Sequence, residues 1–144
     1  MAERSRRAIA FVVLIVAVAA LPARADDQLQ MKHRAERAAH SWLKLVDNGD
    51  YGASWKAASG LFRNGVSQQD WERQAGAVRG PLGALRSREL SGVQYATSLP
   101  GAPDGKYVVL QYNSSFEHKS AAVETLAMML DGERGWRAAG YYIR

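Results

Sequence analysis

Two aspartates flank an Asn-Gly pair in the stretch Asp-Asn-Gly-Asp-Tyr-Gly-Ala-Ser-Trp at residues 47–55, a composition that could suit a metal ion. A calcium loop of the EF-hand type needs oxygen ligands at alternating positions, a glycine at the sixth and a glutamate at the twelfth. Counted from Asp47, the third position is Gly49 and the twelfth is Ala58. The stretch therefore predicts a corner between two helices, with Asp50 as the N-cap of the second helix.

The histidines do not have the spacing of a metal site either. His33 and His40 share a face of a predicted helix but lie about 10.5 Å apart along its axis. A zinc ion, with ligands at about 2.0 Å, cannot bind both. His118, beside Glu117 in a predicted turn, is expected to be exposed. The chain has no cysteine, so thiol chemistry and disulfides are excluded, and we expect neither a metal nor a cofactor.

Glu124 is the best candidate for a catalytic residue. Alternation along the predicted strand at 121–130 places it on the same side as Leu126 and Met128, so it could point inward and act as a general acid or base. The alternative is a residue near the end of a strand that reaches solvent. We favour this alternative, because the sequence shows no partner for the carboxylate.

Aromatic residues could line a pocket for a small apolar ligand. The predicted periodicity sends most of the tryptophans and tyrosines inward or to the rim of the fold, where the majority should be core. Four of them are candidates for lining any cavity that remains, and these are Trp55, Tyr112, Trp136 and Tyr142.

The amino end has the pattern of an export signal. Arginines within residues 4–7 precede an unbroken apolar run at residues 8–21, which is followed by Pro22 and by Ala-Arg-Ala. We predict a cleaved secretory signal peptide at 1–25 and a single mature domain at 26–144, periplasmic or secreted by a bacterium. An uncleaved anchor is the alternative, but the run is shorter than the roughly 20 apolar residues that span a bilayer. After cleavage we expect no stable membrane insertion.

Removal of residues 1–25 also changes the charge of the protein. The full chain has a net charge of +5, but the mature domain keeps 15 basic and 13 acidic residues, a net charge of +2. Such a weak positive charge does not predict a nucleic-acid partner.

The fold class follows from a change in periodicity. Helical spacing at 28–46, 51–59 and 67–80, ending at Gly80-Pro81, gives way to alternating strands at 90–99, 106–118, 121–130 and 135–144. We predict an α+β domain of order ααα-ββββ, with the N-terminal helices packed in the concavity of an antiparallel sheet of about four strands. The sheet should bend strongly, because a straight strand of twelve residues would span about 40 Å, more than the domain is wide.

Three motifs resemble those of a bacterial domain of unknown function, the family numbered 4019. They are Gly-Asp-Tyr at 49–51, Arg-x-Pro-Leu-Gly at 79–83 and Trp-Arg-x-x-Gly-Tyr-Tyr at 136–142. The helix corner and the terminal strand also resemble the nuclear transport factor two-like superfamily, the cystatin-like cone. That resemblance implies a shape and a pocket but no activity. Residues 60–66 are too short for the extra strand that many enzymes of this superfamily have.

Two classes of function remain. The first is a non-enzymatic module that binds a small apolar ligand or a protein. A homodimer through the outer sheet face, where Gln111, Asn113 and Ser115 form a polar stripe, belongs to this class. The second is a small isomerase or hydrolase that uses an inward carboxylate such as Glu124. A membrane-tethered accessory domain has the least support. An inward carboxylate paired with Tyr or His is the feature that would favour an enzyme.

Overall fold

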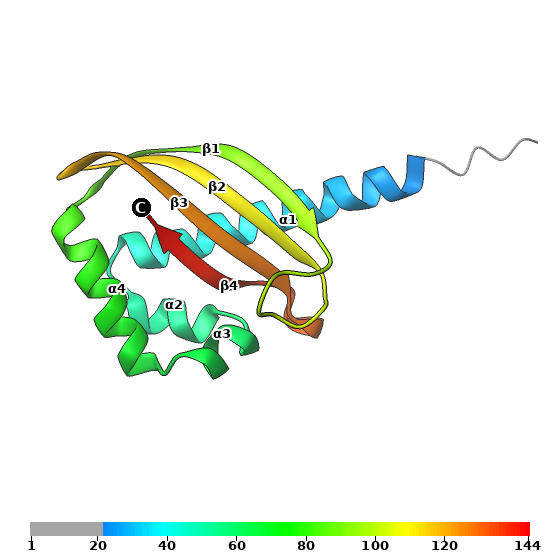
Figure 1. The fold of residues 1–144 in the computed structure, drawn as a ribbon, viewed down its shortest axis with the longest axis horizontal. Coiled ribbons are helices and arrows are strands. Elements are labelled where there is room, and N and C mark those ends of the chain that lie inside the picture. Colours follow the sequence, from blue (N-terminus) through cyan, green and yellow to red (C-terminus); the bar gives the residue numbers. More distant parts are fainter. Residues whose placement is uncertain (1–21) are drawn as a thin grey trace, which may run out of the picture.

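A computed structural model describes residues 22–144, which form four helices followed by four strands (Figure 1). The helices are α1 (Pro22–Asp47), α2 (Tyr51–Ala57), α3 (Gly60–Gly65) and α4 (Gln68–Leu82). The strands are β1 (Leu85–Ala96), β2 (Tyr107–Phe116), β3 (Lys119–Leu130) and β4 (Trp136–Ile143), with a 3₁₀ turn at Gly132–Arg134. Neighbouring strands pair antiparallel in the order β1-β2-β3-β4, so the predicted α+β class and strand order are confirmed.

The sheet arches over the helices, and α1 runs along its concave side (Figure 1). Irregularities in the strand register accompany this curvature. Two lie on β1, before Ser87 and before Gly92, and a third follows Ser114 on β2. The fourth lies in the pairing of β3 with β4, between Ala127 and Met128. A bulge bends the strand that carries it and increases its twist, so it lets long strands wrap around a narrow domain.

The corner between α1 and α2 has the predicted stop but lacks the predicted cap. Gly49, with φ of 76°, ends α1 in the left-handed conformation that glycine adopts easily. Asp50 occupies the N-cap position of α2, but its side chain makes no capping hydrogen bond, so this prediction is wrong. Its ψ of 58° lies outside the extended conformation in which an N-cap side chain reaches the first turn.

Two further helix predictions need correction. The segment at 60–66 forms the short helix α3, capped by Ser59, whose Oγ accepts a hydrogen bond from the Phe62 amide at 3.1 Å. Helix α4 follows its N-cap Ser67, in agreement with the start of the predicted helix at 67–80, but continues through Pro81 to Leu82. A proline is tolerated in this last turn because the helix ends at Gly83, whose φ of 72° reverses the chain.

Strand β1 begins at Leu85, five residues earlier than the predicted strand at 90–99. Its first half pairs with β2, with Arg88 opposite Ser114. A charged residue at an inward position hides the alternation that marks a strand in sequence.

The core joins the helices to the sheet through aromatic side chains and one buried serine. Trp42 of α1 packs against Phe62 and Trp71 of the later helices and against Tyr141 of β4. The indole N–H of Trp42 donates to the carbonyl of Ser54, and that of Trp71 donates to the Ser54 hydroxyl, both at 2.9 Å.

Within residues 22–144 no helix is long and apolar enough to cross a membrane. The predicted signal run at 8–21 lies outside the described residues.

Candidate functional site

Glu124 points into the domain and is fully buried, with 0% exposure. It shares the inner side of β3 with Leu126 and Met128, as the alternation predicts. The favoured alternative, a carboxylate that reaches solvent, is wrong. The sequence did not show the partners that make this burial possible, because they come from other strands and helices.

Four donors surround the Glu124 carboxylate. The Nε and Nη2 of Arg88 donate to its two oxygens at 2.7 and 3.0 Å, in the bidentate geometry that suits a guanidinium. The hydroxyl of Ser114 donates to Oε1 at 2.6 Å, and the hydroxyl of Tyr141 donates to Oε2. An inward carboxylate paired with tyrosine is therefore present.

Arg88 also binds a second carboxylate, that of Asp47 at the end of α1. Its Nη1 and Nη2 donate to the two oxygens of Asp47 at 2.7 and 2.9 Å. Arg79 of α4 donates from Nη2 to the same Asp47 side chain at 2.8 Å. Together with Ser114, Glu124 and Tyr141 these residues form one network, which we call the Arg88 network. It draws on α1, α4 and all four strands.

The network is balanced in charge, with two arginines and two carboxylates. Burial alone would raise the pKa of Asp47, but hydrogen bonds from Arg88 and Arg79 outweigh it and lower the pKa below 3.8. Burial would lower the pKa of Arg88, but its two carboxylate partners raise it, so Arg88 stays charged. Burial and the charge of Glu124 raise the pKa of Tyr141, so its hydroxyl stays protonated and acts as a donor.

This arrangement leaves the Glu124 carboxylate little capacity for chemistry. A carboxylate offers about four lone-pair sites, and four donors already occupy them. A general base needs a free site within hydrogen-bond reach of its substrate. In this geometry Glu124 acts as the buried anchor of three strands rather than as an exposed acid or base.

The four candidate aromatic residues lie in separate places. The Trp55 indole donates to the carbonyl of Val66 at 2.8 Å, between α2 and α3. Tyr112 faces a hollow along α1, and Trp136 lines another hollow between α1 and β4. Tyr142 is 72% exposed. These residues therefore do not share one cavity, and a ligand-binding role for each of them stays a prediction.

The terminal strand shows why Tyr141, and not Tyr142, is the tyrosine that reaches Glu124. Gly140 pairs with Ala127 and Ala138 pairs with Met128, so Ala139 is an extra residue in β4. One inserted residue exchanges the two faces of a strand. As a result Tyr141 points inward to Glu124, while Tyr142 points outward.

A cleft of about 220 Å³ lies between α4 and β4. Its apolar walls include Val78 and Tyr142, and Arg79 lines it together with Tyr141. Val78 is 47% exposed and Tyr142 is 72% exposed. The remaining lining residues are Trp71, Gln74, Ala75 and Ile143. We call this site the α4–β4 cleft.

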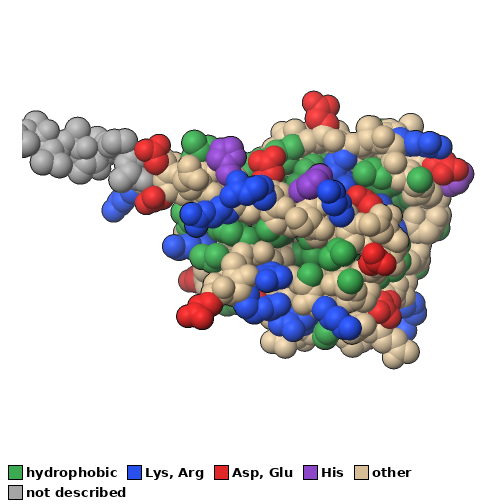
Figure 2. Space-filling view, turned by 180° about the vertical axis from the view of Figure 1, so that it is seen from behind, with side chains coloured by type: hydrophobic (Ala, Val, Ile, Leu, Met, Phe, Trp, Pro, Cys, Tyr) green, Lys and Arg blue, Asp and Glu red, His purple; other side chains and the backbone are tan. Residues whose placement is uncertain are grey.

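A second, wider hollow of about 580 Å³ runs along α1 and is lined by His33, Glu36, His40 and Tyr112, among others. Figure 2 views the molecule from the side of α1, where Lys and Arg side chains alternate with apolar surface.

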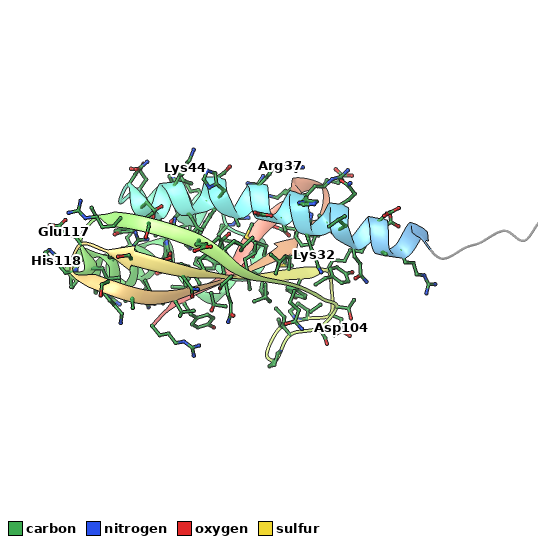
Figure 3. The ribbon with its side chains drawn as sticks, turned by 90° about the horizontal axis from the view of Figure 1, so that it is seen from above. Lys32, Arg37, Lys44, Asp104, Glu117 and His118 are labelled. Atoms are coloured by element: carbon green, nitrogen blue, oxygen red, sulfur yellow. The ribbon has the colours of Figure 1, made fainter. Side chains whose placement is uncertain are left out.

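Within residues 22–144 no three His, Asp or Glu side chains are grouped so that they could hold a metal ion. Glu117 and His118 lie at one tip of the sheet and point away from it, as expected (Figure 3).

Comparison with protein families identifies one match. Residues 38–141 match the family model described as "Protein of unknown function (DUF4019)". The chain belongs to this family. The match runs from the middle of α1 to Tyr141 and confirms the family resemblance seen in the sequence, whereas the resemblance to the cystatin-like cone superfamily stays a prediction. No curated protein matches this DUF4019 chain.

Sequence reasoning missed most of the Arg88 network. Arg79 and Tyr141 were visible in the family motifs at 79–83 and 136–142, but only as signs of resemblance. Arg88 lies two residues from Leu90 and so shares a strand face with it, but no other feature of the sequence marked it. Asp47 was considered only as a metal ligand or as part of a helix corner. The signal that could have found them is the count of charges at inward positions, because each one demands a partner.

Replacing Glu124 tests how much the network stabilises the DUF4019 domain. Glu124→Gln removes one charge of a buried pair and leaves Arg88 undercompensated, so we expect a loss of about 3 kcal/mol in the free energy of unfolding. Urea denaturation measures this loss. Glu117→Gln is the matched control, because Glu117 is exposed and its arginine contact is 4.0 Å long, so we expect a loss below about 1 kcal/mol. Equal stability of the two variants would contradict the role of Glu124.

Asp47 predicts a pH dependence of stability. Its folded pKa is lower than its unfolded pKa, so its contribution is present above about pH 4 and is lost as the pH falls through the folded pKa. Asp47→Asn should therefore destabilise the protein at neutral pH, and this difference should shrink on acidification below about 3.8. Urea denaturation over a pH series measures both curves. For the control Asp104→Asn, on an exposed loop, the free energy of unfolding should follow the same curve against pH as that of the unaltered protein. If the curve for Asp47→Asn also has this shape, Asp47 does not link stability to pH.

Proposed function

We propose that this DUF4019 protein is an exported bacterial domain that binds a small, mostly apolar ligand in the α4–β4 cleft without catalysing a reaction. One observation carries the proposal. Three large hydrophobic side chains are exposed in the described part of the chain, and two of them, Val78 and Tyr142, border this one cleft. Exposed apolar side chains that gather at a concavity are typical of a binding site.

The size of the α4–β4 cleft supports a small ligand. A volume of 220 Å³ corresponds to about seven water molecules at roughly 30 Å³ each. Trp71, Ala75 and Ile143 supply apolar walls, and Gln74 supplies a polar group. An apolar wall with a few polar groups is the usual composition of small-molecule sites.

The inward carboxylate paired with tyrosine, the feature expected of an enzyme, is present, but its burial and its four donors support the non-enzymatic alternative over an isomerase or hydrolase. An isomerase of the predicted kind would use Glu124 as its base, but this carboxylate is fully buried and already accepts from Arg88, Ser114 and Tyr141. Opening the site for a substrate would break several charge-assisted hydrogen bonds. The proposed location in the periplasm or outside the cell rests on the signal-peptide pattern at residues 1–25.

Substitution at the mouth of the cleft tests the proposal. Ethylbenzene, a small apolar probe, should shift the amide resonances of residues around the cleft in the protein as purified. Val78→Asp should weaken this binding about tenfold or more, because it places a charge on an apolar wall. Leu29→Asp is the matched control, since Leu29 is 50% exposed on α1 and lies outside the lining of the cleft, and it should bind as the unaltered protein does. Equal weakening by both variants, or shifts confined to another surface, would refute the site.

The outer face of the sheet supports a second candidate, self-association into a homodimer. The helices lie on the concave side of the sheet (Figure 1). Since side chains alternate along a strand, every second residue of each strand lies on the opposite face. Its centre is built of short polar and small apolar residues, with Gln111 paired with Thr125, Asn113 with Val123 and Val109 with Ala127. Such a mixed surface of polar and small apolar residues suits a reversible interface.

Native mass spectrometry tests the homodimer. If the outer face joins two copies, the protein should have twice the mass of one chain. The double substitution Gln111→Lys with Asn113→Lys should restore the single-chain mass, because it places like charges at the interface. Ser41→Lys, on the exposed side of α1, should leave the dimer intact. A single-chain mass for the unaltered protein would exclude this candidate.

A further inference from the structure

The hollow between α1 and β4, which we call the α1–β4 hollow, has a mostly apolar lining. It lies where β4 passes α1 (Figure 1), and its volume is about 290 Å³. The apolar lining comes from both helices and strands and includes Ala38, Leu45, Ala57, Met128 and Trp136. The hollow shares no lining residue with the α4–β4 cleft. It is therefore a separate place in which an apolar group can leave water.

The charged side chains in the lining of this hollow are both basic. Arg134 and Arg137 line it, and no aspartate or glutamate of the described residues does. The charge of Arg134 is balanced by Asp131, since the Nη1 of Arg134 lies 2.9 Å from the Oδ2 of Asp131. Arg137 has only backbone carbonyls as partners within residues 22–144. The hollow therefore carries one positive charge without a counter-charge.

Backbone hydrogen bonds hold the guanidinium of Arg137 at the border of the hollow. Its Nε donates to the carbonyl of Arg134 at 3.0 Å, and its Nη1 donates to the carbonyl of Ala57 at 3.4 Å. Because Ala57 itself lines the hollow, the second bond places the guanidinium beside it. The Nη2 of Arg137 and the indole N–H of Trp136 have no acceptor among residues 22–144, and both are open to solvent. Two accessible donors therefore lie at this hollow.

Charge decides which ligand suits the α1–β4 hollow. A cation would be repelled by Arg137, and the lining offers no carboxylate to attract it. A neutral apolar molecule would fill the hollow but leave the charged donor without an acceptor. A carboxylate accepts hydrogen bonds from a guanidinium in its plane and supplies the one missing negative charge.

We propose that the α1–β4 hollow binds a small acid that has an apolar body and one carboxylate, such as a short-chain fatty acid. The carboxylate accepts a hydrogen bond from the Nη2 of Arg137, and the apolar body lies against Trp136, Leu45 and Ala38. This site is additional to the α4–β4 cleft and does not depend on the ligand of that cleft.

Three probes with the same six-carbon chain test the class of ligand on the unaltered protein at neutral pH. Hexanoate carries a negative charge, hexan-1-ol is neutral and hexylamine carries a positive charge. We expect hexanoate to bind about fivefold more tightly than hexan-1-ol, because it adds a charge-assisted hydrogen bond. Hexylamine should bind most weakly. The shift of the Trp136 indole N–H resonance on titration measures all three affinities at the hollow.

Arg137→Gln provides the matched variant, because it keeps a polar side chain and removes the charge. The preference for hexanoate over hexan-1-ol should fall to about one, with the affinity for hexan-1-ol unchanged. Arg73→Gln is the control, because it removes the same charge from an exposed position on α4 outside the hollow, and it should keep the preference. If Arg137→Gln does not fold, the order of the three probes on the unaltered protein still decides.

Two results would overturn the inference. One is an affinity for hexanoate no higher than that for hexan-1-ol, and the other is an equal loss of preference in Arg73→Gln and Arg137→Gln, which would show attraction by the net charge alone. Val78→Asp separates this inference from the proposed function. It should weaken the binding of ethylbenzene in the α4–β4 cleft and leave the binding of hexanoate unchanged. Loss of hexanoate binding in this variant would place the acid in the cleft and refute the second site.

Discussion

The guanidinium of Arg88 lies between the buried carboxylate of Glu124 and the partly buried carboxylate of Asp47, and the rest of the structure depends on this arrangement. It binds Glu124 on β3 and Asp47 at the end of α1, and Asp47 in turn binds Arg79 on α4. Each of these charges would be costly to bury alone, and each is tolerated because the others neutralise it. The α4 helix and the arched sheet are thereby fixed at the same corner of α1.

This corner explains both the closed and the open parts of the domain. The Glu124 carboxylate, saturated with donors, joins β1, β2 and β4 from within and leaves no free site for a substrate. Arg79 contributes Nη2 to the network, and its side chain also lines the α4–β4 cleft. The same ion pairs that argue against catalysis at Glu124 thus fix the position of one residue in the wall of this cleft.

The family match covers the residues on which this reasoning rests. It begins within α1 and ends at Tyr141, so it includes both arginines and both carboxylates of the network. Two of the sequence motifs behind the resemblance, at 79–83 and 136–142, contain Arg79 and Tyr141. In the structure, Arg79 on α4 donates a hydrogen bond to Asp47, and Tyr141 on β4 donates one to Glu124. The third motif, at 49–51, holds the glycine that ends α1 directly beyond Asp47.

The sequence by itself determined the elements whose signal is local. The spacing of Ala35, Ala39 and Trp42 defined the buried face of α1, and Gly49 defined its end. Alternation placed Glu124 on the same side of β3 as Leu126, although the sequence favoured an exposed carboxylate. These features depend on neighbours a few residues apart, where periodicity and turn chemistry act.

Only the tertiary structure decided the site. Arg88 meets Glu124 and Asp47 at sequence separations of 36 and 41 residues, and nothing local predicts that an arginine in β1 should point inward. The extra residue in β4 turned Tyr141 toward Glu124, whereas the sequence had named only Tyr142 of these two tyrosines as a candidate. The physical reason is the same in both cases. Burial of a charge or the insertion of a bulge is unfavourable for the segment that contains it, and becomes favourable only when distant partners supply the compensating contacts.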